Sequence, residues 1–95
     1  MVDAERDAFR ADVSGALAQL NEILTSEIGP DETDQVGEYI EHHEFGLALE
    51  LMMALIIKHG VDGRAFRAGV NSLSRRMGMQ DSPEVAEWRK YSSDA

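Results

Sequence analysis

Hydrophobic residues recur at helical spacing in the first part of the chain. They follow one another at steps of three and four residues, with polar residues between them, at Phe9, Val13, Leu17, Leu20, Leu24 and Ile28. This spacing predicts an amphipathic helix over residues 3–28. Gly29-Pro30 ends it, because glycine favours a helix C-terminus and proline cannot continue the helix.

The same signals predict further helices along the rest of the chain. Asp62 is a suitable N-cap for one of them, and Ser82-Pro83 supplies a cap followed by a proline at the first helical position of another. Gly60 and Gly78 are suited to ending the helices that precede them. The predicted helices cover residues 3–28, 31–42, 44–58, 62–77 and 83–91. No segment alternates with the period of a strand, so the sequence predicts one all-α domain over residues 1–95, a small four- to five-helix bundle.

The helix predicted at residues 44–58 is apolar around most of its circumference, which predicts that it lies at the centre of the bundle. A narrow strip of Gly46, Glu50 and Ala54 interrupts this apolar surface. Glu50 must either reach water along the strip or pair with a cation. We expect a structural ion pair, for which the second half of the chain offers Arg64, Arg67, Arg75 and Arg76.

Charge is distributed unevenly along the chain. The net charge is −9; residues 1–60 hold 13 acidic and 3 basic residues, and no Lys or Arg occurs from Ala11 to Ile57. Such a balance argues against direct binding to nucleic acid or to an anionic membrane, because both require basic residues to replace counterions. A field of one sign instead attracts basic proteins.

Other sequence features limit the classes of protein to which the chain could belong. There is no cysteine, so no disulfide or thiolate chemistry is expected. The longest apolar run, residues 45–57, is too short to span a bilayer, and the charged first twenty residues do not resemble a secretory signal. The expectation is a cytoplasmic protein, either a monomer or a homodimer.

The acidic residues of the second predicted helix lie on one side of it. Placed at about 100° per residue, Val36, Tyr39, Ile40 and His43 share one side, where we expect His43 to be half-buried at the joint with the next helix. The opposite side carries an acidic stripe of Asp31, Asp34, Glu38 and Glu41. A solvated face usually mixes charge signs, because like charges repel. The stripe therefore favours a binding role over a plain solvated face.

The adjacent His42 and His43 point in different directions on this helix and do not chelate one ion together. Glu38 and His42 share a face, with Glu41 nearby, but no H-E-x-x-H motif or related metal signature supports them. No nucleophile or glycine-rich phosphate loop accompanies the pair either. The sequence predicts no metal, no cofactor and no catalytic residue.

The stretch EYIEHHEFGLALELM at residues 38–52 resembles the MafI-type immunity proteins of bacterial polymorphic toxin systems. The resemblance lies in Tyr39-Ile40, in the histidine before Glu44, and in Ala48-Leu49-Glu50 with the apolar helix that follows. His43 departs from it, since such sequences tend to have glycine before the glutamate. The resemblance implies a protein that binds and neutralises a cognate toxin, often a nuclease.

Two functions follow as hypotheses. In the first, an immunity protein covers the basic cleft of a nuclease toxin, and the expected contacts are Asp31, Glu32, Asp34, Glu38, Glu41, His42 and Glu44. In the second, the chain is an accessory or regulatory protein that dimerises through the strip of the central helix or through the helix at residues 62–77. An enzyme is the least favoured class.

Overall fold

The protein is built of helices throughout the part of the chain that the structure describes. The computed structural model describes the backbone of residues 2–94 and the side chains of residues 7–93. Its elements are α1 (Val2–Ile28), α2 (Pro30–Glu41), α3 (Phe45–Lys58), the 3-10 turn η1 (Gly63–Ala65), α4 (Arg67–Arg76) and α5 (Pro83–Asp94). The predicted all-α bundle is confirmed. Within residues 2–94, no helix combines the length and apolarity needed to cross a membrane.

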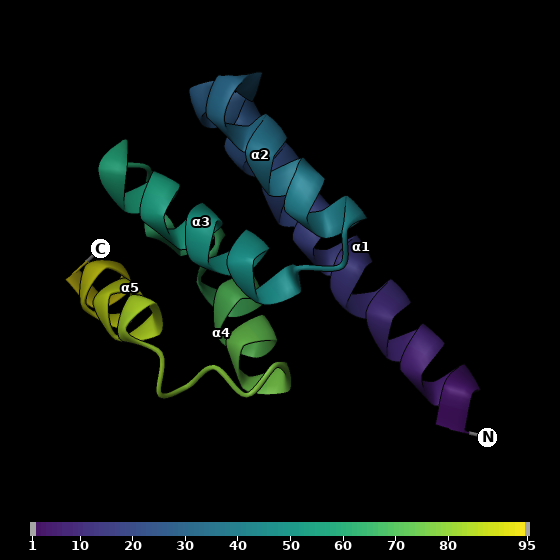
Figure 1. Ribbon diagram of the computed structural model, residues 1–95. Coiled ribbons are helices and arrows are strands. Elements are labelled where there is room, and N and C mark those ends of the chain that lie inside the picture. Colours follow the sequence, from purple (N-terminus) through teal and green to yellow (C-terminus); the bar gives the residue numbers. More distant parts are fainter. Residues whose placement is uncertain (1, 95) are drawn as a thin grey trace.

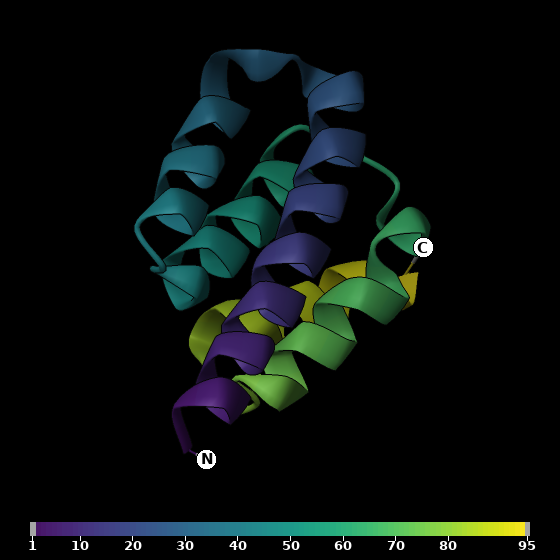
Figure 2. The same ribbon diagram turned by 90° about the vertical axis from the view of Figure 1, so that its right-hand side faces the viewer.

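The helices are arranged around α3. In Figures 1 and 2, α1 and α2 run side by side as an antiparallel hairpin; α3 packs against them and lies behind them in Figure 2. The sharp reversal between α1 and α2 uses Gly29, whose φ of 87° favours glycine, and then Pro30 at the first helical position. α4 contacts α1, and α5 contacts α3 on the side away from the hairpin.

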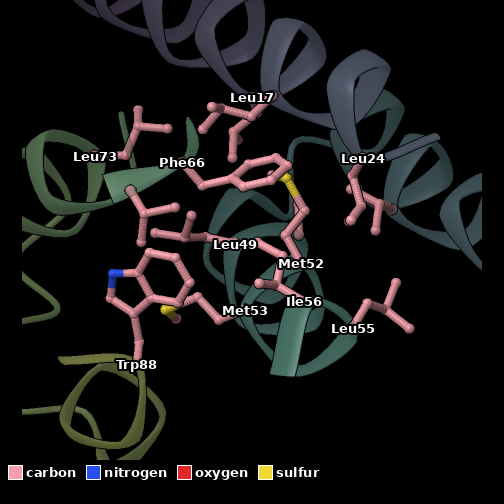
Figure 3. Packing of buried hydrophobic residues seen from close by; sticks show 14 of the residues in the cluster. Leu17, Leu24, Leu49, Met52, Met53, Leu55, Ile56, Phe66, Leu73 and Trp88 are labelled. Carbon is pink, nitrogen blue, oxygen red and sulfur yellow. The ribbon is translucent and has the colours of Figure 1, made fainter. Parts of the chain in front are cut away.

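α3 supplies the centre of the hydrophobic core. Its buried residues are Ala48, Leu49, Met52, Met53, Leu55 and Ile56. Figure 3 shows Phe66 below Leu17 of α1 and next to Met52, while the Met53 sulfur lies beside the Trp88 indole of α5. Phe66 and Trp88 are both fully buried, so side chains from distant parts of the chain meet on α3.

The segment predicted as one helix over residues 62–77 is instead divided. A 3-10 turn over Gly63–Ala65 comes first, and α4 begins only at Arg67. Asp62 caps the turn as predicted for a helix start, since the Arg64 N–H donates to its side chain at 3.0 Å. The turn packs on α5: a Cβ on Gly63 would lie in van der Waals contact with the Tyr91 ring at 3.4 Å, and the Tyr91 hydroxyl donates to the Val61 carbonyl.

Phenylalanine-to-alanine substitutions at two positions test where the core lies. Phe66→Ala removes a fully buried ring and is expected to lower the free energy of unfolding by about 3–5 kcal/mol. Phe9→Ala removes a ring that is 42% exposed and is expected to cost about 1 kcal/mol or less. Urea denaturation of both variants measures the difference, and equal losses would contradict this core.

Candidate binding surface

The acidic stripe of α2 faces solvent, as the helical pattern predicted. Asp31, Asp34, Glu38 and Glu41 are all exposed; we call these four residues the acidic surface. On the opposite side of α2, Thr33, Val36 and Ile40 are buried. Burial of that side fixes the rotation of α2 about its axis and therefore turns the four carboxylates outward.

Three of these carboxylates border a groove between α1 and α2. The groove has a volume of about 350 Å³, and its lining is polar. Its lining residues are Asn21, Thr25, Thr33, Asp34, Gly37, Glu38 and Glu41. The acidic surface is therefore concave along one side.

A polar network below the groove ties α2 to α1. The Thr25 and Thr33 hydroxyl oxygens lie 2.7 Å apart, and Thr33 Oγ1 donates to the Gly29 carbonyl at 3.0 Å. Asn21 Nδ2 donates to the Thr33 carbonyl at 3.2 Å. Thr33 is only 2% exposed, so its hydroxyl needs these partners. The network holds the acidic surface in a fixed position on α1.

Glu32, predicted from the sequence as one of the partner contacts, points away from the acidic surface. Its carboxylate oxygens lie 2.8 Å from Lys58 Nζ and 2.7 Å from His59 Nε2, at the end of α3. Hydrogen bonds from Lys58 and then from His59 lower the pKa of Glu32. Glu32 points toward α3 and contributes to the contact between α2 and α3, so it is an intramolecular partner there.

The predicted helix over residues 31–42 ends at Glu41, and a tight turn separates it from α3. The His43 N–H donates to the Ile40 carbonyl and the Glu44 N–H to the Tyr39 carbonyl, at 3.1 and 2.8 Å. This pair of bonds is a Schellman motif, which requires a left-handed residue. That residue is His43, with a φ of 58°.

His43 is also exposed, so the expectation of a half-buried joint residue was wrong. The reason is the left-handed turn, which carries its side chain off the buried side of α2 and places its ring 5.5 Å from that of Phe45. His42 and Glu44 are exposed beside it. They extend the acidic surface toward the start of α3.

Two other helices end in the same way with glycine at the left-handed position. α3 is closed by Gly60 with a φ of 64°, and α4 by Gly78 with a φ of 67°. Among the three motifs, His43 alone carries a Cβ in a conformation that costs most residues about 1–2 kcal/mol. A glycine at position 43 would remove this conformational strain.

Glu50 does not form the predicted ion pair with an arginine. Arg64 binds Asp62 at 2.8 Å, Arg76 lies 3.8 Å from Asp12, and Arg67 donates to the Ser92 carbonyl. Arg75 forms no ion pair among the described side chains. The prediction was wrong because α5, and not α4, packs beside this part of α3.

Glu50 instead faces other carboxylates. With Glu84 and Glu87 of α5 it lines a small cavity of about 40 Å³. Burial, followed by the nearby charge of Glu84 and a hydrogen bond to it, raises the pKa of Glu50. A hydrogen bond from Ser82 helps to keep the pKa of Glu84 low, so Glu50 is the member of the pair that takes up the proton.

The chemistry of the site is that of charged contacts. Among the described side chains, no three His, Asp or Glu residues converge closely enough to hold a metal ion. No family model, no curated protein and no solved structure matches this chain. The interpretation of the acidic surface therefore depends on its own geometry and charge.

His43→Gly is expected to stabilise the protein by about 0.5–1 kcal/mol, because the relief of left-handed strain exceeds the entropy that glycine loses on folding. His42→Gly is the matched control, since His42 has a φ of −90° and no such strain; this change is expected to give no gain. Chemical denaturation at one pH compares the two. A loss of stability in His43→Gly would contradict the account.

Glu50→Gln is expected to stabilise the protein at neutral pH. The pKa of Glu50 is higher in the folded protein than in the unfolded chain, so the wild type loses stability as the pH rises through the folded pKa. The variant lacks this loss, and its advantage should disappear when the pH is lowered below the unfolded value. Glu22→Gln, an exposed residue with the same charge change, serves as the control. Denaturation curves between about pH 4 and pH 7 measure both, and parallel profiles would contradict the assignment.

Proposed function

We propose that this protein binds a basic protein partner through the acidic surface of α2. One contrast carries the proposal. Glu32, the acidic residue of α2 that points toward the fold, is paired with Lys58 and His59, whereas the four residues that point outward form no ion pair among the described side chains. No Lys or Arg occurs from Ala11 to Ile57 to compensate them.

This arrangement favours intermolecular binding over stability. Exposed carboxylates at helical spacing of three and four repel one another by a few tenths of a kcal/mol per pair. A uniformly negative face attracts a basic protein over distance and raises the association rate. Because the polar network already fixes α2 on α1, little ordering is required when the partner arrives.

The identity of the partner is proposed from the resemblance of residues 38–52 to MafI-type immunity proteins. On that basis the partner is a toxin with a basic nuclease domain, and the protein is its immunity protein. A nuclease holds phosphates in a basic cleft, so a carboxylate-bearing helix in that cleft would exclude nucleic acid. Inhibition of this kind needs binding alone, with no reaction by the inhibitor. Such inhibition would take place where the toxin acts, so the proposal includes a cytoplasmic location.

Affinity capture from native lysate at low and high salt, followed by a nuclease assay of the captured protein, tests this function. We expect one basic protein that is retained at low salt, is released as salt rises, and degrades nucleic acid only when this chain is absent. Capture of no basic protein, or of a protein whose nuclease activity is unaffected by this chain, would contradict it.

Charge-reversal substitutions test whether the partner binds at the acidic surface. Glu38→Lys with Glu41→Lys is expected to weaken binding of the captured toxin by tenfold or more, because like charges across an interface cost several kcal/mol. Circular dichroism should remain unchanged, since both side chains are exposed. Asp7→Lys with Asp81→Lys changes the net charge equally at exposed positions outside the acidic surface. Equal weakening by the two pairs would assign the effect to net charge and contradict a specific surface.

A further inference from the structure

α3 has one narrow side that the other helices leave uncovered. Leu47 is 48% exposed, the largest exposed fraction among the large hydrophobic side chains that the structure describes. Leu51 is partly exposed and Ala54 is exposed. Spaced four and three apart, these residues lie in one line along the helix. We call them the α3 strip, which shares only Ala54 with the strip of Gly46, Glu50 and Ala54 predicted from the sequence. Figure 1 shows α3 between α2 and α5 with no other segment passing in front of it.

A row of carboxylates borders this strip on the side of α5. It consists of Glu50, Glu84 and Glu87, which line the small cavity together with apolar atoms of Met53, Ala54 and Ile57. We call these three residues the acidic edge. None of them forms an ion pair with a described Lys, Arg or His.

The packing of α5 fixes the acidic edge in place. Val85 and Trp88 are fully buried against the core, and Glu84 and Glu87 each precede one of them in the sequence. Their side chains are therefore held next to α3, where they meet Glu50. Like charges brought together in this way are relieved either by a proton on one carboxyl group or by a cation, and the described part of the fold supplies no cation in an ion pair with them.

The charge of this site disfavours two occupants. A second copy of the chain, packed antiparallel on the α3 strip about a two-fold axis, would bring its own acidic edge against this one. An anionic lipid surface would meet the same repulsion. A helix with apolar residues on one side and lysine or arginine beside them satisfies both the strip and the edge, and the small side chain of Ala54 lets it approach closely.

We propose that the α3 strip and the acidic edge form a docking site for a basic amphipathic helix of another protein. The helix lays its apolar side on Leu47, Leu51 and Ala54 and points its cationic side chains toward Glu50, Glu84 and Glu87. This is helix-in-groove recognition with anchors at spacings of three and four. The site is on α3 and α5, separate from the acidic surface of α2, and does not depend on the function proposed above.

A pH dependence accompanies this docking. The pKa of Glu50 is raised by burial and by Glu84, and the carboxyl groups that face it from α5 are those of Glu84 and Glu87. A bound cation favours the ionised form of Glu50, so binding releases protons. The affinity should therefore rise with pH through the range in which Glu50 titrates, and this part of the rise should be lost in Glu50→Gln.

The test uses the full chain and a synthetic amphipathic peptide of about four helical turns, with leucines spaced three and four apart and lysines along one edge. Fluorescence anisotropy of the labelled peptide measures the affinity. Glu84→Gln with Glu87→Gln is expected to weaken binding about five- to twentyfold. Ala54→Gln, which fills the line of approach, should weaken it about tenfold. A peptide with glutamate in place of lysine should not bind.

Matched variants keep the proposal open to refutation. Asp7→Asn with Asp81→Asn removes two exposed charges elsewhere, and Ala18→Gln alters an exposed alanine of α1; neither should change the affinity. Equal effects of these controls, or no effect of Ala54→Gln, would overturn the docking site. So would a homodimer that Ala54→Gln dissociates. If Glu38→Gln with Glu41→Gln abolishes binding instead, the peptide occupies the acidic surface of α2, which overturns this site and leaves the function proposed above standing.

Discussion

The need to cover α3 determines where the other helices lie. Six of its fourteen residues are buried, and they point in several directions around the helix axis. No single neighbouring helix can cover such a surface, so α2 packs on one side of it, α5 on the other, and α1 and the segment at Phe66 complete the core. Hydrophobic burial of this kind is the main favourable contribution to folding.

The placement of the charges follows from this arrangement. With Val36 and Ile40 directed at the core, the four carboxylates of the acidic surface lie on the opposite side of α2 and face solvent. With Val85 and Trp88 buried, those at the start of α5 are brought to Glu50. One set of acids is therefore spread over an open face, and the other is gathered beside an exposed apolar strip. The two sets are suited to different partners, the first to a basic surface and the second to a basic helix.

Local sequence signals predicted much of this structure. The apolar spacing of α1, the stop at Gly29-Pro30 and the start at Ser82-Pro83 act over a few residues, so they can be read without knowing the fold. The outward direction of Asp31, Asp34, Glu38 and Glu41 follows from the same periodicity. Thr33 is a signal that was missed. It shares the inward side with Val36 and Ile40, and a polar residue at such a position indicates a hydrogen-bonded contact between helices.

The remaining features depend on tertiary packing. The neighbours of Glu50 are set by which helix docks beside α3, and the abundance of arginine in the second half of the chain pointed to the wrong one. The division of the helix predicted at residues 62–77 occurs where Gly63 packs against Tyr91 and Trp88 of α5. The left-handed conformation of His43 does not follow from the residue type alone, because histidine, although enriched in this region among non-glycine residues, adopts it in only a minority of cases. The turn into α3 imposes it.

The central claim is that an uncompensated negative face steers a basic partner to this protein. Its most direct test is the association rate constant with the captured partner, measured by stopped-flow over a range of salt concentrations. The account predicts that the association rate constant falls steeply as salt increases, while the dissociation rate constant changes little. An association rate constant that is independent of salt would contradict it.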